Sequence, residues 1–291
     1  MGVRDVNADV TTWFDGRARV LFVHAHPDDE TIATGGTLAA LAEAGREPLL
    51  VTLTRGERGE VVAGPLEALV AAHGIAVARQ NELKTALGML GVDRHAFLGV
   101  EPARAEGYPP AIYEDSGMAW GPDGRATAAE DASPDALTSA PAVEALNDLL
   151  AAAYQSNAQA IVSYDDGGGY GHPDHVFAHR LARAVAHALE IPFWAIVSDV
   201  FSSDAGPVPA DTSPNTVEAH DVSPWLPRKT AALRAYATQL TVDGDEIVHV
   251  GGQREPIGTV EAFRRLTPAP SGPGAESAPG GEASSAEAPA G

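Results

Sequence analysis

Short apolar runs alternate along this chain with longer stretches in which apolar residues recur at helical spacing. The apolar runs predict five strands, near residues 18–25, 48–54, 94–99, 159–164 and 193–200. The helical spacing predicts five helices, near residues 30–44, 76–90, 139–156, 174–189 and 226–239. Gly45 and Gly91 stand where two of these helices should end, because a helix end favours a residue that tolerates positive φ.

The expected strands are continuously apolar rather than alternating, which is typical of a parallel sheet covered on both faces. Strands and helices that alternate along the chain indicate an α/β fold with right-handed crossovers. We therefore predict a Rossmann-like, mostly parallel sheet flanked by helices. Its common strand order, 3-2-1-4-5, would make strands one and four neighbours.

Two segments interrupt this alternation. Residues 100–138 are rich in Pro, Gly, Ala and acidic residues but include aromatic side chains, so we predict a long substrate loop there. Residues 267–291 contain Pro, Gly, Ala, Ser and Glu without an aromatic residue, and we predict a disordered tail. The remainder, residues 1–266, should form a single α/β domain.

Two clusters of His and Asp residues follow the first and fourth expected strands. His26-Pro27-Asp28-Asp29 follows the first, and His172-Pro173-Asp174-His175 follows the fourth. Ligands bind such sheets at the carboxyl ends of the strands, where the strand order reverses. We therefore expect both clusters to form one metal site at the carboxyl edge of strands one and four. The rings of His26 and His175 must then lie within about 5 Å of each other, roughly twice a metal–nitrogen bond.

The chain has no cysteine, so any metal must be held by imidazole and carboxylate groups. Such ligands suit zinc, ferrous iron, manganese or cobalt. A catalytic metal has three protein ligands and one open position, and we assign His26, Asp29 and His175 as the ligands. Asp28 then lies beside the metal, where it can act as the general base.

His172 lies three residues before His175, so both can face the same site at a helix start. Asp174 is expected to orient His172 or to hold it cationic, which would make His172 a donor to a developing oxyanion. Tyr170 can supply a second donor. Either cluster alone is also compatible with an ordinary helix start, with Asp28 or Asp29 as the N-cap.

The formal net charge is −21, from 40 acidic and 19 basic residues. Such a surface repels nucleic acid and anionic lipid, so we expect neither as a partner. No signal peptide or membrane span is expected, because no basic start precedes an apolar core and no apolar run approaches the length that spans a bilayer. We therefore expect a cytoplasmic protein with a small-molecule substrate. The sequence predicts no oligomeric state.

These motifs resemble those of the zinc-dependent sugar de-N-acetylases, the family that includes the glycosylphosphatidylinositol-precursor deacetylases. The resemblance rests on residues 25–30 (Ala-His-Pro-Asp-Asp-Glu) and 172–175 (His-Pro-Asp-His). Within the family the chain is most similar to the mycothiol-pathway deacetylases, which act on N-acetylglucosaminyl-inositol. That closer resemblance also uses residues 115–119 (Asp-Ser-Gly-Met-Ala) and 229–233 (Lys-Thr-Ala-Ala-Leu).

The resemblance implies zinc on the three proposed ligands, Asp28 as the base, His172 as the acid or oxyanion partner, and Tyr170 as the group that polarises the acetyl carbonyl. It also implies that Arg79 grips the sugar or inositol hydroxyls and that Asp115 and Met118 line the same pocket. From the sequence alone, Arg79 is also compatible with a surface arginine on a helix.

We therefore predict a metal-dependent hydrolase that removes acetate from an N-acetylated amino sugar, with N-acetylglucosaminyl-myo-inositol as the expected substrate. The first alternative is an amidase of mycothiol S-conjugates, which would share every catalytic residue. A second is a ferrous oxygenase, because two histidines and a carboxylate also hold iron. A third is a sugar-binding protein without catalytic activity.

Overall fold

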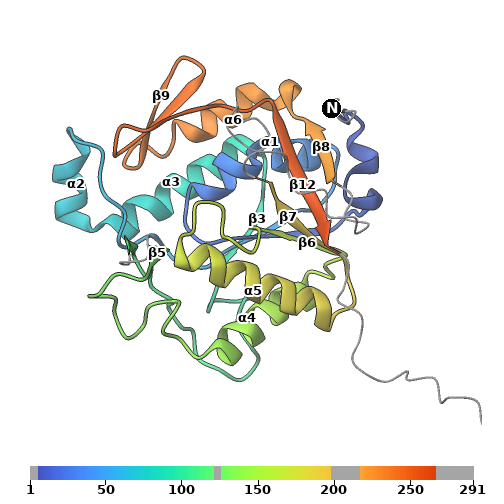
Figure 1. Ribbon diagram of the computed structural model, residues 1–291, viewed down its shortest axis with the longest axis horizontal. Coiled ribbons are helices and arrows are strands. Elements are labelled where there is room, and N and C mark those ends of the chain that lie inside the picture. Colours follow the sequence, from blue (N-terminus) through green and yellow to red (C-terminus); the bar gives the residue numbers. More distant parts are fainter. Residues whose placement is uncertain (1–5, 121–125, 198–216, 267–291) are drawn as a thin grey trace, which may run out of the picture.

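The computed structural model describes residues 6–120, 126–197 and 217–266 (Figure 1). The tail that we predict to be disordered, residues 267–291, lies outside these residues. So does the end of the predicted fifth strand, residues 198–200. The division into one domain and a tail stays a prediction.

A seven-stranded sheet forms the centre of the molecule, in the order β3-β2-β1-β6-β7-β12-β8. The first five strands in that order pair in parallel, as an α/β fold requires. Every residue of β1, β2, β6 and β7 is buried, which explains why these strands are apolar up to their last residues. The predicted α/β fold is confirmed, and the observed order contains the expected 3-2-1-4-5 arrangement. The parallel strands are β1 (Val20–His24), β2 (Leu49–Thr52), β3 (Arg94–Phe97), β6 (Ala160–Ser163) and β7 (Phe193–Ile196).

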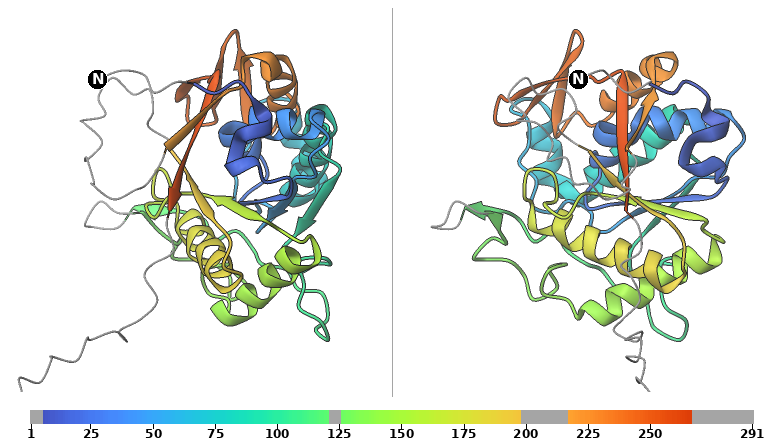
Figure 2. Two further views of the ribbon diagram at one scale, coloured as in Figure 1. Left: turned by 90° about the vertical axis from the view of Figure 1, so that its right-hand side faces the viewer. Right: turned by 45° about the vertical axis from the view of Figure 1, so that its right-hand side comes forward.

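Helices cover both faces of the sheet (Figure 2). One face carries α1 (Asp29–Glu43), α3 (Ile75–Leu90) and α6 (Leu226–Leu233), and the other carries α4 (Ala142–Gln155) and α5 (Pro173–Ala188). All five coincide with predicted helices. The last is shorter than the predicted 226–239, because the chain turns after Leu233 and brings Tyr236 and Leu240 into the core.

The structure also contains several short elements that the sequence did not predict, most of them in the C-terminal part of the chain. Strand β12 (Val260–Leu266) pairs antiparallel with both β7 and β8 (Val217–Asp221) at one edge of the sheet. These strands mix charged and apolar residues, so no continuous apolar run marks them. The other missed elements are η1 (Val10–Gly16), α2 (Leu66–His73), β4 (Ala119–Trp120), β5 (Ala126–Thr127), η2 (Ser223–Trp225), β9 (Leu240–Asp243), β10 (Glu246–His249) and β11 (Arg254–Pro256). None of the described helices combines the length and the apolar character that a bilayer crossing requires.

The buried carboxylate of Glu261 in β12 joins α1 to the C-terminal part of the chain. The Lys229 ammonium lies 2.8 Å from the Glu261 carboxylate, and both side chains are almost fully buried. The same carboxylate accepts hydrogen bonds from the backbone N–H groups of Gly36 (2.9 Å) and Thr37 (2.8 Å), in the middle of α1. Three donors thus surround one buried carboxylate, which compensates its desolvation.

Gly36 permits this close approach. A Cβ atom at Gly36 would lie 2.4 Å from the Cβ of Val222, well inside van der Waals contact. A glycine inside a helix reduces helix stability, so its presence here is explained by packing rather than by helix propensity.

Substituting Gly36 therefore tests this packing. We expect Gly36→Ala to lower the free energy of unfolding by about 1–3 kcal/mol, because the added methyl group overpacks the contact with Val222. Gly88→Ala in α3 is the matched control, since a Cβ there would meet no atom of the described chain within 4 Å. The control should stabilise by up to about 1 kcal/mol. Denaturant titration measures both, and equal effects of the two substitutions would contradict the packing argument.

Candidate metal centre

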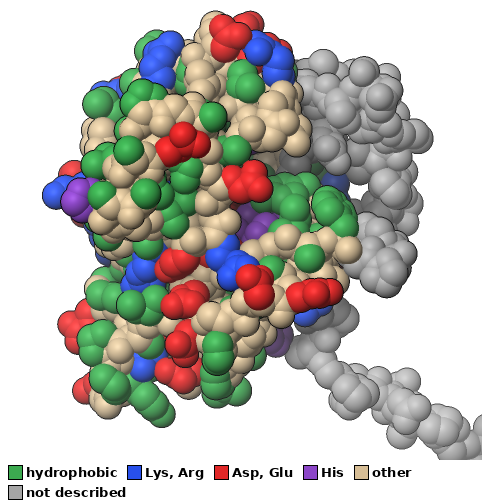
Figure 3. Space-filling model, turned by 90° about the vertical axis from the view of Figure 1, so that its left-hand side faces the viewer, with side chains coloured by type: hydrophobic (Ala, Val, Ile, Leu, Met, Phe, Trp, Pro, Cys, Tyr) green, Lys and Arg blue, Asp and Glu red, His purple; other side chains and the backbone are tan. Residues whose placement is uncertain are grey.

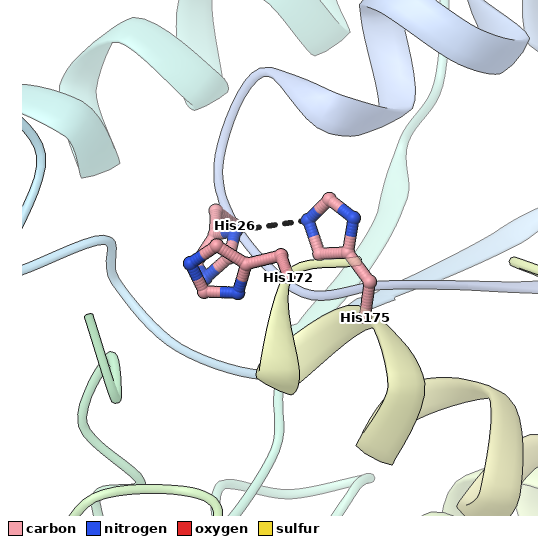
Figure 4. A group of neighbouring side chains, drawn as sticks. All are labelled: His26, His172 and His175. Carbon is pink, nitrogen blue, oxygen red and sulfur yellow. Dashed lines mark hydrogen bonds between the residues drawn. The ribbon is translucent and has the colours of Figure 1, made fainter. Parts of the chain in front are cut away.

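The fold brings the two His/Asp clusters together. Strands β1 and β6 are parallel neighbours, so the loop after His24 and the loop after Ser163 leave the sheet at the same edge. His172 is the N-cap residue of α5, and His175 lies in its first turn. Figure 4 shows the rings of His26, His172 and His175 turned toward one another. In Figure 3, histidine side chains are visible in a hollow bordered by acidic and basic side chains.

The three residues assigned as ligands form a nearly equilateral triangle. The Nδ1 atom of His26 lies 3.3 Å from Nε2 of His175. The Oδ2 atom of Asp29 lies 3.2 Å from Nδ1 of His26 and 3.3 Å from Nε2 of His175. In a tetrahedral zinc site with bonds of about 2.0–2.1 Å, ligand atoms lie roughly 3.3–3.4 Å apart. The triangle therefore fits a divalent metal, and the expected proximity of His26 and His175 is present.

Hydrogen bonds on the far side of each ring set the tautomers that a metal requires. Nε2 of His26 lies 3.2 Å from the Asp174 carboxylate, and Nδ1 of His175 lies 3.2 Å from the carbonyl oxygen of Gly168. Because an acceptor holds the proton on the far nitrogen, the lone pair of the near nitrogen points into the triangle. This is the usual arrangement behind metal-binding histidines.

Two further groupings bring possible ligand atoms within 4.8 Å of one another: His26 with His172 and His175, and His26 with Asp115, His172 and Asp174. In the second grouping the carboxylates already have partners. Asp174 Oδ2 accepts from the Ser116 N–H (2.9 Å) as well as contacting His26. Asp115 Oδ1 accepts from the Gly117 N–H (2.8 Å). Asp29 Oδ2 also accepts from the Tyr164 hydroxyl (2.7 Å) and the His26 backbone N–H (2.9 Å), so it is the near-tetrahedral spacing of its triangle that favours the set with Asp29.

The charges around His26 favour a cation. Burial by itself lowers the pKa of His26, but the carboxylates of Asp115, Asp174 and Asp29 overcome that effect and raise it well above the usual value. A site that binds a proton this strongly without a metal also favours a divalent cation in the proton's place.

Asp28 has an unusual backbone conformation. Its φ is 115°, a region that residues other than glycine rarely adopt, and it immediately precedes α1. Its carboxylate lies 3.1 Å from the Arg79 guanidinium. Burial raises the pKa of Asp28 to about 6, although the charge of Arg79 acts in the opposite direction. Asp28 thus adjoins the proposed ligand Asp29 in the chain, while its own carboxylate pairs with Arg79.

His172 and Tyr170 border the same centre. The Nδ1 atom of His172 accepts from the Asp174 N–H (3.2 Å), which places the proton of a neutral ring on Nε2. Burial, together with the imidazoles of His26 and His175, lowers the pKa of His172 to about 4. The cationic form considered from the sequence is therefore wrong, but the neutral ring still carries a donor. The Tyr170 ring centre lies 5.1 Å from that of His175, and its side chain is largely exposed.

Asp174 and Arg79 have partners in the structure that the sequence did not predict. The Asp174 carboxylate contacts His26, whereas only its backbone N–H contacts His172. Arg79 is buried rather than on the surface, and it donates to the carbonyl oxygens of Pro27 (2.5 Å) and Gly56 (3.1 Å) in addition to pairing with Asp28. Arg79 therefore stabilises the loop that carries Asp28.

The other two expected pocket residues lie in the segment before β4. Asp115 is buried, with Oδ1 3.6 Å from Nε2 of His26. Met118 is partly exposed. The structure thus brings Asp115 to the metal centre and leaves the side chain of Met118 accessible.

Tyr164 was missed in the sequence. Its hydroxyl donates to Asp29 Oδ2 (2.7 Å) and accepts from the Ala25 N–H (2.9 Å), while its ring stacks on His175 with centres 4.0 Å apart. Tyr164 thus fixes two of the three proposed ligands. Its position directly after β6, at the carboxyl edge where the site was expected, was the available signal.

The family model for GlcNAc-PI de-N-acetylase matches residues 21–186, which include both clusters. The chain belongs to this family. Two relatives named 1D-myo-inositol 2-acetamido-2-deoxy-alpha-D-glucopyranoside deacetylase are each 36% identical to it. The match to the Kineococcus radiotolerans protein covers 89% of this chain and 80% of the relative. The match to the Saccharomonospora viridis protein covers 84% of this chain and 93% of that relative.

A solved deacetylase from the biosynthesis pathway of teicoplanin has the same fold. Its TM-score is 0.57 at 19% identity, over 87% of this chain and 100% of the other. The resemblance stated from the motifs is therefore confirmed, and with it the assignment of the chain to a family of deacetylating enzymes.

The contact between Asp174 and His26 generates a prediction about metal affinity. We expect Asp174→Asn to weaken metal binding about 10- to 100-fold, because the amide no longer fixes the His26 tautomer with a negative charge. Competition with a chromophoric chelator measures the affinity. Asp166→Asn, an exposed change of the same kind in the loop after β6, should leave it unchanged. Wild-type affinity in Asp174→Asn would show that His26 needs no such partner.

Proposed function

We propose that this protein is a zinc-dependent deacetylase that removes acetate from N-acetylglucosaminyl-myo-inositol in mycothiol biosynthesis. The observation that carries the proposal is the triangle of His26, Asp29 and His175, with Asp28 next to it in the chain. The substrate is supported by relatives of that printed activity, which align with most of this chain. Zinc is supported by the ligand set of two imidazoles and one carboxylate.

A zinc ion held by His26, Asp29 and His175 would polarise the acetyl carbonyl and acidify the attacking water. The protein's own groups move the protons. Asp28 takes a proton from the water as its oxygen adds to the acetyl carbon. Asp28 then returns that proton to the sugar nitrogen as the carbon–nitrogen bond breaks, which releases acetate and a free amine.

Two donors stabilise the negative charge that develops on the carbonyl oxygen. The Nε2–H of neutral His172 is one, because its Nδ1 is held by the Asp174 N–H. The hydroxyl of Tyr170 is the other, since a phenol with the ordinary pKa of about 10 stays protonated at neutral pH. Asp115 and Met118 border the same centre and are proposed to contact the sugar. Arg79 is proposed to contribute by holding Asp28.

The activity itself is tested with purified protein and a panel of N-acetylglucosamine derivatives. We expect acetate release to be fastest with the inositol-linked sugar, to stop when a chelator removes the metal, and to return when zinc is restored. Enzymatic quantification of acetate measures this. Release under argon would exclude an oxygenase. Faster cleavage of a mycothiol S-conjugate would instead favour the amidase alternative, and no cleavage of any substrate would favour a binding protein.

Replacing Asp28 tests its assignment as the base. We expect Asp28→Asn to retain metal and lower turnover by roughly 10²–10⁴-fold, because the amide cannot accept the proton. Metal analysis and acetate release are measured on the same preparation. Asp93→Asn, an exposed change just before β3 at the opposite edge of the sheet, should keep wild-type turnover. Unchanged turnover in Asp28→Asn would rule out the base assignment.

A further inference from the structure

Asp28 has a backbone conformation that its own sequence does not favour. A φ of 115° is sparsely populated for a residue with a Cβ atom, so the surrounding structure must impose it. Residues Thr31 and Ile32 donate to the Asp28 carbonyl, as in any helix start, and these bonds leave the N–H of Asp28 to be fixed by another group.

That group is the side chain of Glu30. Its Oε2 accepts the Asp28 N–H at 3.0 Å. Its Oε1 accepts the Tyr236 hydroxyl at 2.5 Å and also the hydroxyl of Thr31. Glu30 is fully buried, so a carboxylate there depends on its donors. Two hydroxyls on one oxygen fix the orientation of the carboxylate and direct the other oxygen at Asp28.

We propose that Tyr236 is a positioning residue for catalysis: through Glu30, its hydroxyl holds the backbone of Asp28 in the conformation that places the base. This inference rests on the proposed function, in which Asp28 moves the proton. Tyr236 comes from the turn after α6, and its ring is fully buried in the core between the sheet and helices α1, α3 and α6. The packing of the C-terminal part of the chain therefore determines where the Tyr236 hydroxyl meets the Glu30 carboxylate.

Arg79 and Tyr236 restrain Asp28 in different ways. Arg79 pairs with the carboxylate of Asp28 and with the carbonyl oxygen of Pro27. Tyr236 acts on the backbone N–H through Glu30. Loss of the Tyr236 hydroxyl should let the Glu30 carboxylate rotate. The backbone of Asp28 should then relax toward a φ that residues with a Cβ atom commonly adopt. The base would then move, while the three metal ligands and their outer partners would keep their contacts.

A double-mutant cycle tests the inference. We expect Tyr236→Phe to lower kcat about 10- to 100-fold, the usual scale for a misplaced catalytic group, with KM and metal content unchanged. In an Asp28→Asn background the same substitution should change kcat less than about twofold, because no base remains to be positioned. If Tyr236→Phe fails to fold, Thr31→Val removes the other hydroxyl donor to Glu30 and should give the same pattern.

Gly36→Ala is the control for lost stability. It weakens α1 two turns beyond the metal ligand, so it should lower the free energy of unfolding without changing kcat. Wild-type kcat in Tyr236→Phe, or an equal decrease in both backgrounds, would overturn the positioning role and leave Asp28 as the base. Wild-type turnover in Asp28→Asn itself would instead overturn the proposed mechanism.

Discussion

The pairing of β1 with β6 is the constraint on which the active site depends. Strands 140 residues apart in the sequence lie side by side in parallel, with Phe22 opposite Val162, and their carboxyl ends open at the same edge. The segment after β1 then supplies His26 and Asp29, and the segment after β6 supplies His175, the three proposed metal ligands. Because both strands are completely buried, slipping either one along the other would move each side chain into a space packed for another. The core thus fixes the distance between His26 and His175.

Around this pair, the proposed ligands and Asp28 are each held by a specific partner. Asp174 and the Gly168 carbonyl set the histidine tautomers, and Tyr164 fixes the Asp29 carboxylate. Arg79 pairs with Asp28. Buried charges are costly unless they are paired or coordinate a metal, so the concentration of carboxylates is consistent with a bound cation. The arrangement prepares the groups before substrate arrives, which is the condition for effective electrostatic catalysis.

Two residues of the C-terminal part of the chain form hydrogen bonds with α1. Glu261 accepts two N–H groups in the middle of the helix, and Tyr236 reaches Glu30 in its first turn. The C-terminal part of the chain is thus connected to the residues that carry the proposed chemistry. The family model ends at residue 186, whereas the relatives of deacetylase name align over most of the chain. Tyr236 and Glu261, which contact α1, both lie after residue 186 and therefore outside the family model.

The sequence by itself determined the five parallel strands, the five main helices, the α/β class and the edge at which the two clusters meet. These features follow from local periodicity and from the handedness of crossover connections, which need no knowledge of distant contacts. Only the tertiary structure decided that Asp174 serves His26, that Arg79 is buried against Asp28, and that Tyr236 reaches Glu30. Each of these contacts joins segments distant in the chain through a single pair of polar atoms. Such a contact leaves no repeating pattern in the sequence, so it can be identified only from the positions of the packed helices and strands in the folded structure.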